Sequence, residues 1–186
     1  LGHAAGVLEV EYISDGGRMA QAVVWLGALA EPSVVRATMI DGAKVWTRAA
    51  AESARAAPPI GELGAWVIEA DDAVERAGLL GLLAGEIGAR EWCPGLGLLT
   101  ADTAATAEWC TAFEVRARMA WNERRIRAWL REHDGGIVEV KTRGGAAQTD
   151  ALQTHLRGAG STAYTVFVLR NGRSMEAVVA VRRPRA

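Results

Sequence analysis

A lysine and an arginine stand two residues apart near the end of an expected strand, directly before two glycines. The stretch VEVKTRGG (138–145) alternates apolar and polar residues, so its valines share one face and Lys141 lies on the other. Cationic side chains at such a position suit contact with phosphate groups of a nucleic acid. The alternative is structural, in which Arg143 bonds the C-terminus of a helix.

A second set of cations lies on an expected helix, WNERRIRAWLREH (121–133). At 100° per residue, Arg124, Arg127 and Arg131 fall on one side of this helix, opposite its apolar residues. Phosphate contacts by these arginines would make binding dependent on salt. The alternative is a solvated helix face, on which Arg127 pairs with Glu123 four residues earlier.

Aromatic residues offer one further candidate for nucleic-acid contact. The chain has seven tryptophans, and most of them fall in apolar patterns that indicate core packing. Trp121 stands at the margin of the arginine face, so we retain it as a stacking platform for a base.

Other chemistries find no support in the residue spacings. Cys93, Cys110, His133 and His155 match no zinc-ligand pattern, and the two cysteines form no CxxC pair. We expect two buried thiols outside any disulfide, no metal and no catalytic residue. Helix capping accounts for the acidic run that includes Asp71, Asp72 and Glu75.

Charge is unevenly distributed along the 186 residues, although the net charge is only −1. Residues 1–110 hold 7 basic and 15 acidic residues, a balance of −8, and residues 111–186 hold 14 and 7, a balance of +7. Such asymmetry points to a basic binding module attached to something acidic. No apolar run is long enough for a membrane span, and we expect a cytoplasmic protein without membrane contact.

The acidic half begins with two expected hairpins. One joins the strands 7–13 and 22–27, and the other turns at Asp41-Gly42 between 34–40 and 43–46. Two hairpins are too thin to bury themselves, so residues 1–49 are expected to form the edge of a larger sheet. A linker is expected over residues 50–62, which contain Pro58-Pro59.

Residues 63–120 are expected to be a helical connector. A helix begins near Asp72, with Glu75 in capping-box spacing, and its three glycines demand close packing against a neighbour. A loop over 91–102 then leads into a short apolar strand.

Residues 121–186 read as a compact module with the order α-β-α-β-β. The basic helix ends at Asp134-Gly135-Gly136, and a second helix covers 148–158. Asn171-Gly172 joins the last two strands in the strongest hairpin signal of the chain. The sequence thus predicts an α+β fold in which both helices cover one face of the module's sheet.

Several stretches resemble a known family: AWVIEADDAVERAGLL (65–80), LGLLTADTAATAEWCTAFEV (96–115), NERRIRAWLREHDGGIVEVKTRG (122–144) and VFVLRNGRSMEAVVAVRR (166–183). In order and spacing they look like the C-terminal region of bacterial class I S-adenosylmethionine-dependent methyltransferases that end in a THUMP-like domain. The resemblance implies that residues 1–49 are terminal strands of the methyltransferase sheet and that residues 121–186 are a THUMP-like module holding RNA.

The same resemblance assigns Lys141 and Arg143 to the family's basic strand end and Gly144 to its following glycine. Family members often have three basic residues there, whereas this chain has Lys141-Thr142-Arg143 and so one charge fewer.

The cofactor site implied by the family is not expected within this chain. A class I methyltransferase binds S-adenosylmethionine at a glycine-rich loop after a first strand, followed by an acidic residue that ends the next strand. Gly16-Gly17 lies in an expected turn and Gly95-x-Gly97 precedes a strand. A start at Leu1 fits a fragment whose S-adenosylmethionine domain lies upstream and which does not methylate alone.

Two functions remain in competition. The first is RNA presentation to the upstream methyltransferase domain, and the second is a protein-interaction or purely structural module whose acidic half docks on its basic half. Charge location separates them. Solvent exposure of the arginine face together with Lys141 favours binding, and coverage by acidic residues from 62–91 favours the structural function.

Overall fold

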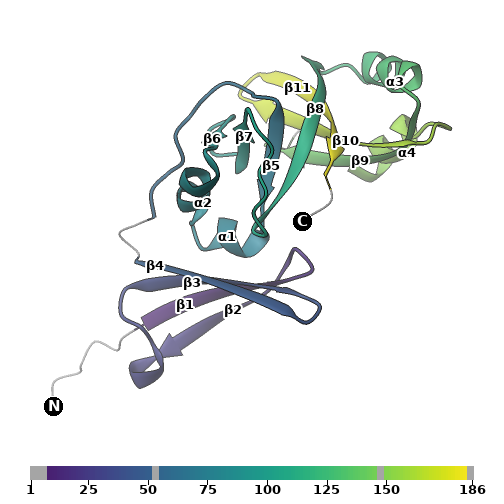
Figure 1. The fold of residues 1–186 in the computed structure, drawn as a ribbon. Helices are drawn as coiled ribbons and strands as arrows, with labels where there is room; N and C mark the ends of the chain where they lie inside the picture. Colours follow the sequence, from purple (N-terminus) through teal and green to yellow (C-terminus); the bar gives the residue numbers. More distant parts are fainter. Residues whose placement is uncertain (1–7, 52–54, 146–148, 184–186) are drawn as a thin grey trace.

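The computed structural model describes residues 8–51, 55–145 and 149–183 (Figure 1). Its strands form two mixed sheets, one of four strands and one of seven. No helix in these described ranges is both long and apolar enough to cross a membrane. The fold is α+β, as the sequence predicts, and it contains few helices.

The four-stranded sheet has the order β2-β1-β3-β4, with β1 and β3 parallel and the other neighbours antiparallel. Its elements are β1 (Leu8–Asp15), β2 (Arg18–Leu26), the 3-10 turn η1 (Gly27–Leu29), β3 (Val34–Asp41) and β4 (Lys44–Ala51). The two expected hairpins are present. They pair with each other into a separate sheet, and they do not extend the seven-stranded one.

The second hairpin turns one residue later than the sequence suggests. Asp41 pairs with Lys44, so Gly42 and Ala43 are the central residues, and only Gly42 has a positive φ, of 58°. The first hairpin turns at Gly16 and Gly17, with φ values of 57° and 81°. Both turns therefore use the glycine freedom that a tight hairpin requires.

The helix expected from Asp72 is interrupted. The chain forms α1 (Asp72–Arg76) and α2 (Leu80–Ile87), and Gly78 between them has a φ of 70°. A Cβ added to Gly81 would collide with the carbonyl oxygen of Ala56, which explains the demand for close packing. In the expected linker, Ile60 forms an isolated bridge with Glu91, while residues 52–54 lie outside the described ranges.

The seven-stranded sheet has the order β6-β7-β5-β8-β11-β10-β9. Its strands are β5 (Trp66–Ala70), β6 (Arg90–Glu91), β7 (Leu98–Ala101), β8 (Cys110–Ala120), β9 (Gly135–Arg143), β10 (Thr162–Asn171) and β11 (Ser174–Arg182). With α3 (Glu123–Glu132) and α4 (Thr149–Leu156), the last five elements follow the expected order α-β-α-β-β. The segment expected to be a helical connector, 63–120, differs, because it also supplies β5 to β8 to this sheet.

This sheet is strongly curled. Glu69 on β5 contacts Lys141 and Arg143 on β9 at 2.7 Å each, although β8, β11 and β10 separate the two strands. On a flat sheet, four inter-strand spacings would place β5 and β9 about 19 Å apart. A curl closes this gap, and a β-bulge in β8, between its pairs with Val179 and Ala180, increases the local twist.

The curl gives the sheet two different faces. The convex face packs against α3 and α4 through Ile126, Leu130, Val140 and Val166. The concave face carries its own apolar cluster, in which Phe113 and Phe167 meet edge to face with ring centroids 5.0 Å apart. Alternation along β9 therefore directs the valines to the helices and Lys141 into the concave side.

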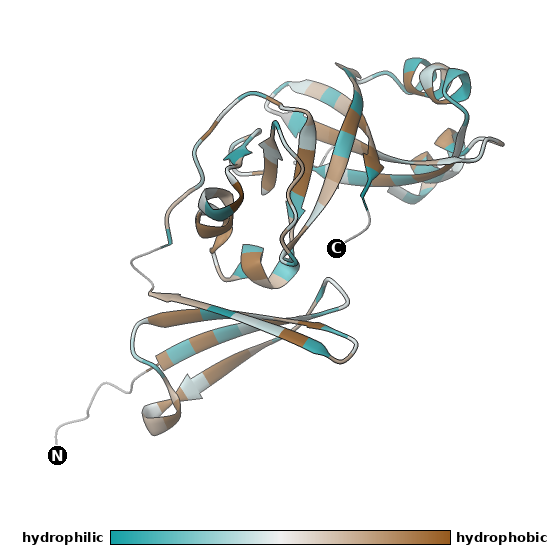
Figure 2. Ribbon diagram, in the orientation of Figure 1, coloured by the Kyte–Doolittle hydropathy of each residue, from teal (hydrophilic) through white to brown (hydrophobic). Residues whose placement is uncertain are grey.

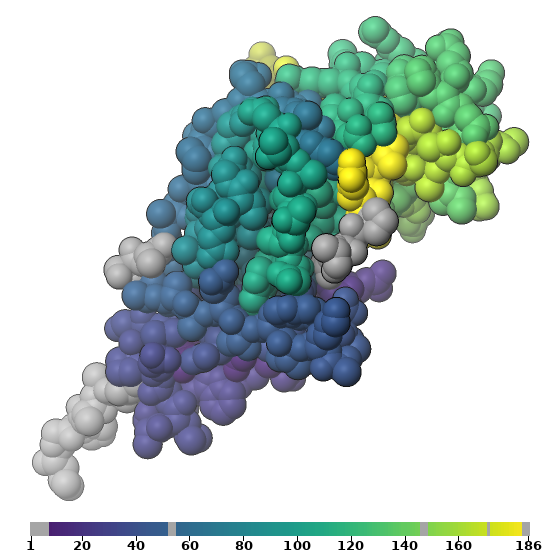
Figure 3. Space-filling model, viewed as in Figure 1, coloured from purple at the N-terminus to yellow at the C-terminus, as the bar shows by residue number. Residues whose placement is uncertain are grey.

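The two sheets share one core. Val35, Ala37 and Met39 of β3 pack in the same cluster as residues of α1, α2 and β5. Figure 3 shows the purple and blue atoms of the first sheet against the teal segment that holds these helices. Figure 2 shows how hydrophobic and hydrophilic residues alternate along the strands. The first sheet is thus an integral layer of the molecule.

Replacing Met39 tests this shared core. Met39 is 1% exposed, and Met39→Ala should lower the free energy of unfolding by about 2 to 5 kcal/mol because it leaves a cavity. Val45→Ala, on the same sheet at a side chain 61% exposed, should change it by less than about 0.5 kcal/mol. Urea denaturation measures both. Equal, small effects would mean that the first sheet does not stabilise the rest.

Candidate functional site

Lys141 and Arg143 lie in an ion triad on the concave side of the sheet. Glu69 accepts from Lys141 Nζ through one oxygen and from Arg143 Nη2 through the other, at 2.7 Å each. Glu139 lies 3.4 Å from Lys141 Nζ, and Arg143 also donates to the carbonyl oxygen of Thr142. The two predicted phosphate-contact residues are therefore already paired with an acidic residue from 62–91.

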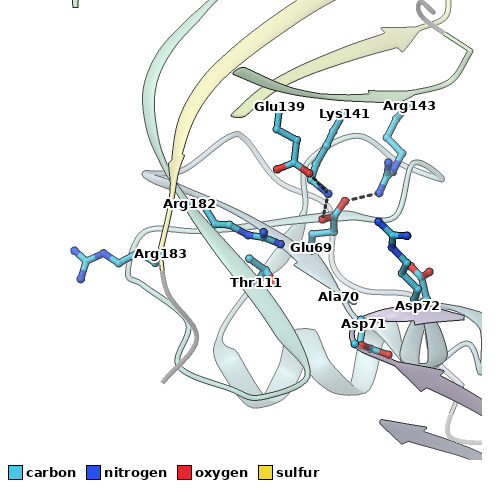
Figure 4. Close-up of a pocket in the computed structure, with 13 residues that line it drawn as sticks. Glu69, Ala70, Asp71, Asp72, Thr111, Glu139, Lys141, Arg143, Arg182 and Arg183 are labelled. Atoms are coloured by element: carbon cyan, nitrogen blue, oxygen red, sulfur yellow. Dashed lines mark hydrogen bonds and ion pairs between the residues drawn. The ribbon is translucent and has the colours of Figure 1, made fainter. Parts of the chain in front are cut away.

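A cavity of about 690 Å³ opens beside this triad (Figure 4). Its walls come from the β1–β2 turn, the junction of β5 and α1, the start of β8, and the ends of β9 and β11. The lining residues are Gly16, Gly17, Arg18, Glu69, Ala70, Asp71, Asp72, Thr111, Glu139, Lys141, Arg143, Arg182 and Arg183. Residues far apart in sequence thus meet around one space.

The acidic end of the cavity is built by the start of α1. Asp71 is the N-cap and accepts from the backbone N–H of Ala73 at 3.0 Å and from the Ser14 hydroxyl at 2.5 Å, both through Oδ1. The expected capping role is confirmed, with the cap one residue earlier than Asp72. Asp71 Oδ2 is buried and has no hydrogen-bond partner among the described residues.

Gly144 directly follows β9, in a backbone conformation that favours glycine. Its φ of 67° favours glycine, and an added Cβ would lie 2.5 Å from the carbonyl oxygen of Arg170. Its position beside the triad is therefore fixed by backbone geometry. Contact between nucleic acid and Lys141, Arg143 or Gly144 stays a prediction.

The arginines of α3 lie on the other side of the sheet, in solvent. Arg124, Arg127 and Arg131 are exposed and form no ion pair with any residue in the described ranges. The expected pair of Glu123 with Arg127 is absent there, because Glu123 lies 3.4 Å from His155 of α4. Asn122 caps the helix by accepting from the backbone N–H of Arg125.

Two of these arginines line a groove of about 440 Å³ between the ends of α3 and α4. Arg127, Arg131 and Arg157 line this arginine groove together with the apolar residues Leu130 and Leu156. We did not predict Arg157 as a site residue from the sequence. Its basic side chain directly after the second expected helix could have marked it as a candidate. Its proximity to Arg127, however, depends on the packing of α4 beside α3.

Trp121 is half-buried against the apolar cluster beneath α3 and α4, and its backbone N–H donates to the carbonyl oxygen of Met175. Much of its surface is thus used for packing. Trp66 is buried, as its apolar pattern predicts, and so are Trp92 and Trp109. Trp25 and Trp129, for which core packing is also expected, are half-buried.

Both cysteines are buried, and neither forms a disulfide. Burial, reinforced by the nearby Glu176 carboxylate, raises the pKa of the Cys93 thiol to about 11, which disfavours the reactive thiolate. Within the described ranges, no group of three or more histidine, cysteine, aspartate or glutamate side chains is arranged to hold a metal.

At the arginine groove, the backbone of the loop after α4 crosses the start of β9 at glycine residues. Gly158 donates its N–H to Gly136, and Gly160 donates to Gly135, at 2.9 and 3.0 Å. A Cβ on Gly158 would overlap the carbonyl oxygen of Gly135. The loop after α4 can therefore cross the start of β9 only without a side chain at this position.

Gly158→Ala tests this crossing. We expect a loss of about 1 to 3 kcal/mol in the free energy of unfolding, because the methyl group forces the two segments apart. Gly85→Ala is the matched control: nothing lies within 4 Å of its added Cβ, and the change should stabilise α2 by up to about 1 kcal/mol. Thermal or urea unfolding of both variants decides, and a neutral Gly158→Ala would contradict the tight crossing.

The chain is similar to one protein family and to two proteins of known sequence. Residues 110–183 match the family described as THUMP domain-like, so the match begins with β8, eleven residues before the expected start of the module at Trp121. Two proteins of Mycobacterium tuberculosis, strains CDC 1551 and H37Rv, are each 32% identical over 165 residues. Both are named uncharacterized S-adenosylmethionine-dependent methyltransferases.

The alignment covers 88% of this chain but 44% of each mycobacterial protein, so the chain spans less than half the length of these relatives. The crystal structure of a candidate methyltransferase from Porphyromonas gingivalis W83 superposes with a TM-score of 0.75 at 14% identity. The superposition covers 97% of this chain and 47% of the Porphyromonas chain, and at 14% identity the similarity shows a common fold.

Proposed function

We propose that this chain is part of an S-adenosylmethionine-dependent methyltransferase that carries a THUMP-like domain, like the relatives it resembles, and that it holds RNA for methylation by a catalytic domain. S-adenosylmethionine would bind to that domain. Within this chain, Gly16-Gly17 turns between β1 and β2, and Gly95 and Gly97 lie between β6 and β7. Neither pair forms the strand-loop-helix that holds the cofactor.

One observation carries the proposal: Arg127, Arg131 and Arg157 surround a single groove, and none is neutralised by an ion pair within the described residues. Unpaired guanidinium groups around a groove suit the phosphates of a nucleic acid, since each contact releases a condensed counterion. Arg124 and the half-buried Trp121 would extend the same surface along α3.

The competing structural function is favoured at a different place. At Glu69, the acidic half contacts Lys141 and Arg143 of the basic half, as an intramolecular docking module requires. Lys141 and the α3 arginines also face opposite sides of the sheet. The RNA surface proposed here is therefore the arginine groove, and the ion triad lies outside it.

Salt-dependent binding of a structured RNA hairpin tests the proposal. Arg127→Ala/Arg131→Ala should weaken binding at low salt and reduce the slope of log K against log salt by roughly 1 to 2, because two phosphate contacts are lost. Fluorescence anisotropy over a range of salt concentrations measures the slope.

Arg48→Ala/Arg116→Ala is the charge-matched control. Both arginines are about as exposed as typical surface residues, at 40% and 45%, and both already pair with glutamates, Glu86 and Glu114. This variant should bind RNA nearly as wild type. Equal losses in the two double variants would assign binding to overall charge, and absence of RNA binding by the folded wild type would favour the interaction-module function.

A further inference from the structure

The cavity beside the ion triad is separate from the arginine groove, because the curled sheet lies between them. Its lining residues divide by charge. Lys141, Arg143 and Arg182, together with Glu69 and Glu139, line one end, which has an excess of cations. Asp71 and Asp72 at the start of α1, together with Arg18, line the other end, which has an excess of carboxylates. A space with a cationic end and an acidic end suits a ligand that has an anionic group at one end and hydrogen-bond donors at the other.

The cationic end keeps donors for such a ligand. A lysine has three N–H donors and an arginine has five; Lys141 faces Glu69 and Glu139, and Arg143 donates to Glu69 and the Thr142 carbonyl oxygen, so each keeps at least one donor. Arg182 forms no ion pair with the described residues, and Figure 4 shows its guanidinium directed toward Glu69. Three cations around Glu69 and Glu139 leave this end with a net positive charge.

The acidic end contains an unmet hydrogen-bond acceptor. Asp71 is 2% exposed, and its Oδ2 has no partner among the described residues. Leaving a buried carboxylate oxygen unpaired is costly, and a donor that binds as the Asp71 side chain turns toward the cavity would relieve that cost. Among the described residues, the adjacent Asp72 accepts a backbone N–H from Met19 at 3.1 Å through Oδ2, and its other oxygen retains acceptor capacity.

From this arrangement we propose that the cavity binds one nucleoside monophosphate unit. Its phosphate contacts Arg182, Lys141 and Arg143, and hydroxyl or amino donors of its ribose and base face Asp71 and Asp72. The cavity volume of about 690 Å³ lies within the range of small-ligand sites. Such a unit can be a free nucleotide or a nucleotide of an RNA strand, and the site goes beyond the RNA surface proposed on α3.

Calorimetric titration of the full chain with AMP tests the site. We expect AMP to bind at least tenfold more tightly than adenosine or inorganic phosphate, since each of these probes uses one end of the cavity. Comparable affinities for AMP and inorganic phosphate would reduce the site to a simple anion site and overturn the proposal. Absence of AMP binding at millimolar concentration would also overturn it.

Neighbouring arginines provide a matched pair of variants. Arg182→Ala should weaken AMP binding at least fivefold. Arg183 also lines the cavity, but Arg183→Ala should weaken binding clearly less, because Figure 4 shows Arg183 directed away from the triad and its guanidinium lies over the ring of Trp66 at 5.0 Å. Equal losses in both variants would contradict the proposed position of the phosphate.

Glu69→Gln separates binding from a purely structural triad. Removing this negative charge should raise AMP affinity several-fold, because the phosphate no longer shares its cations with a carboxylate. Lower or unchanged affinity in a variant whose thermal unfolding confirms an intact fold would overturn the site.

Two further arms identify the source and keep the proposals distinct. Competition between AMP and a single-stranded RNA trimer assigns the site to a nucleotide of a strand, and lack of competition assigns it to a free nucleotide. Arg127→Ala/Arg131→Ala should bind AMP as wild type even where hairpin RNA binding is lost. A parallel loss of AMP binding in that variant would contradict an independent site.

Discussion

The curl of the seven-stranded sheet is the constraint on which the other features of this molecule depend. A Glu69 carboxylate on β5 can reach Lys141 and Arg143 on β9 only if the intervening strands bend toward one another. Right-handed strand twist and the bulge in β8 supply the bend. The apolar residues around Phe113 and Phe167 fill the concave side, and the ion triad lies at its polar end.

This curvature sorts the charged residues into two environments. Lys141 and Arg143 on the concave side meet Glu69 from the acidic half, whereas the arginines on α3 and after α4 point away from the sheet and remain in solvent. The opposite net charges of the two halves are thus partly neutralised inside the fold and partly left on its surface. The second group contributes a positive electrostatic field at the surface, which attracts an approaching polyanion.

The contact between halves also explains why the first sheet belongs to the fold. Its β3 residues pack on α1 and α2, and its β1–β2 turn lines the cavity beside the triad. Ser14 of β1 hydrogen-bonds the Asp71 cap of α1, so the layers meet through polar as well as apolar contacts. A site at this junction therefore requires the first sheet, α1 and the seven-stranded sheet to stay packed together.

Local chemistry was readable from the sequence. The hairpins, the α-β-α-β-β order, the end of the basic helix near Asp134, which has a φ of 55°, and the alternation along β9 each depend on a few neighbouring residues. The sequence placed Arg127 and Arg131 correctly on an exposed helix face for the same reason. The strands within 63–120 and the break at Gly78 were missed, because short buried strands and glycine-rich helices have similar apolar patterns.

What Lys141 faces was decided by the tertiary structure alone. Alternation fixed that its side chain leaves the helix-packed face, but the partner on the other side, Glu69, lies 72 residues away and four strands across the sheet. The same holds for Arg157 beside Arg127, and for the cavity where β1, α1, β9 and β11 meet. Sequence determined each side chain's local direction, whereas sheet curvature, which sums small twists over many strands, determined which directions converge.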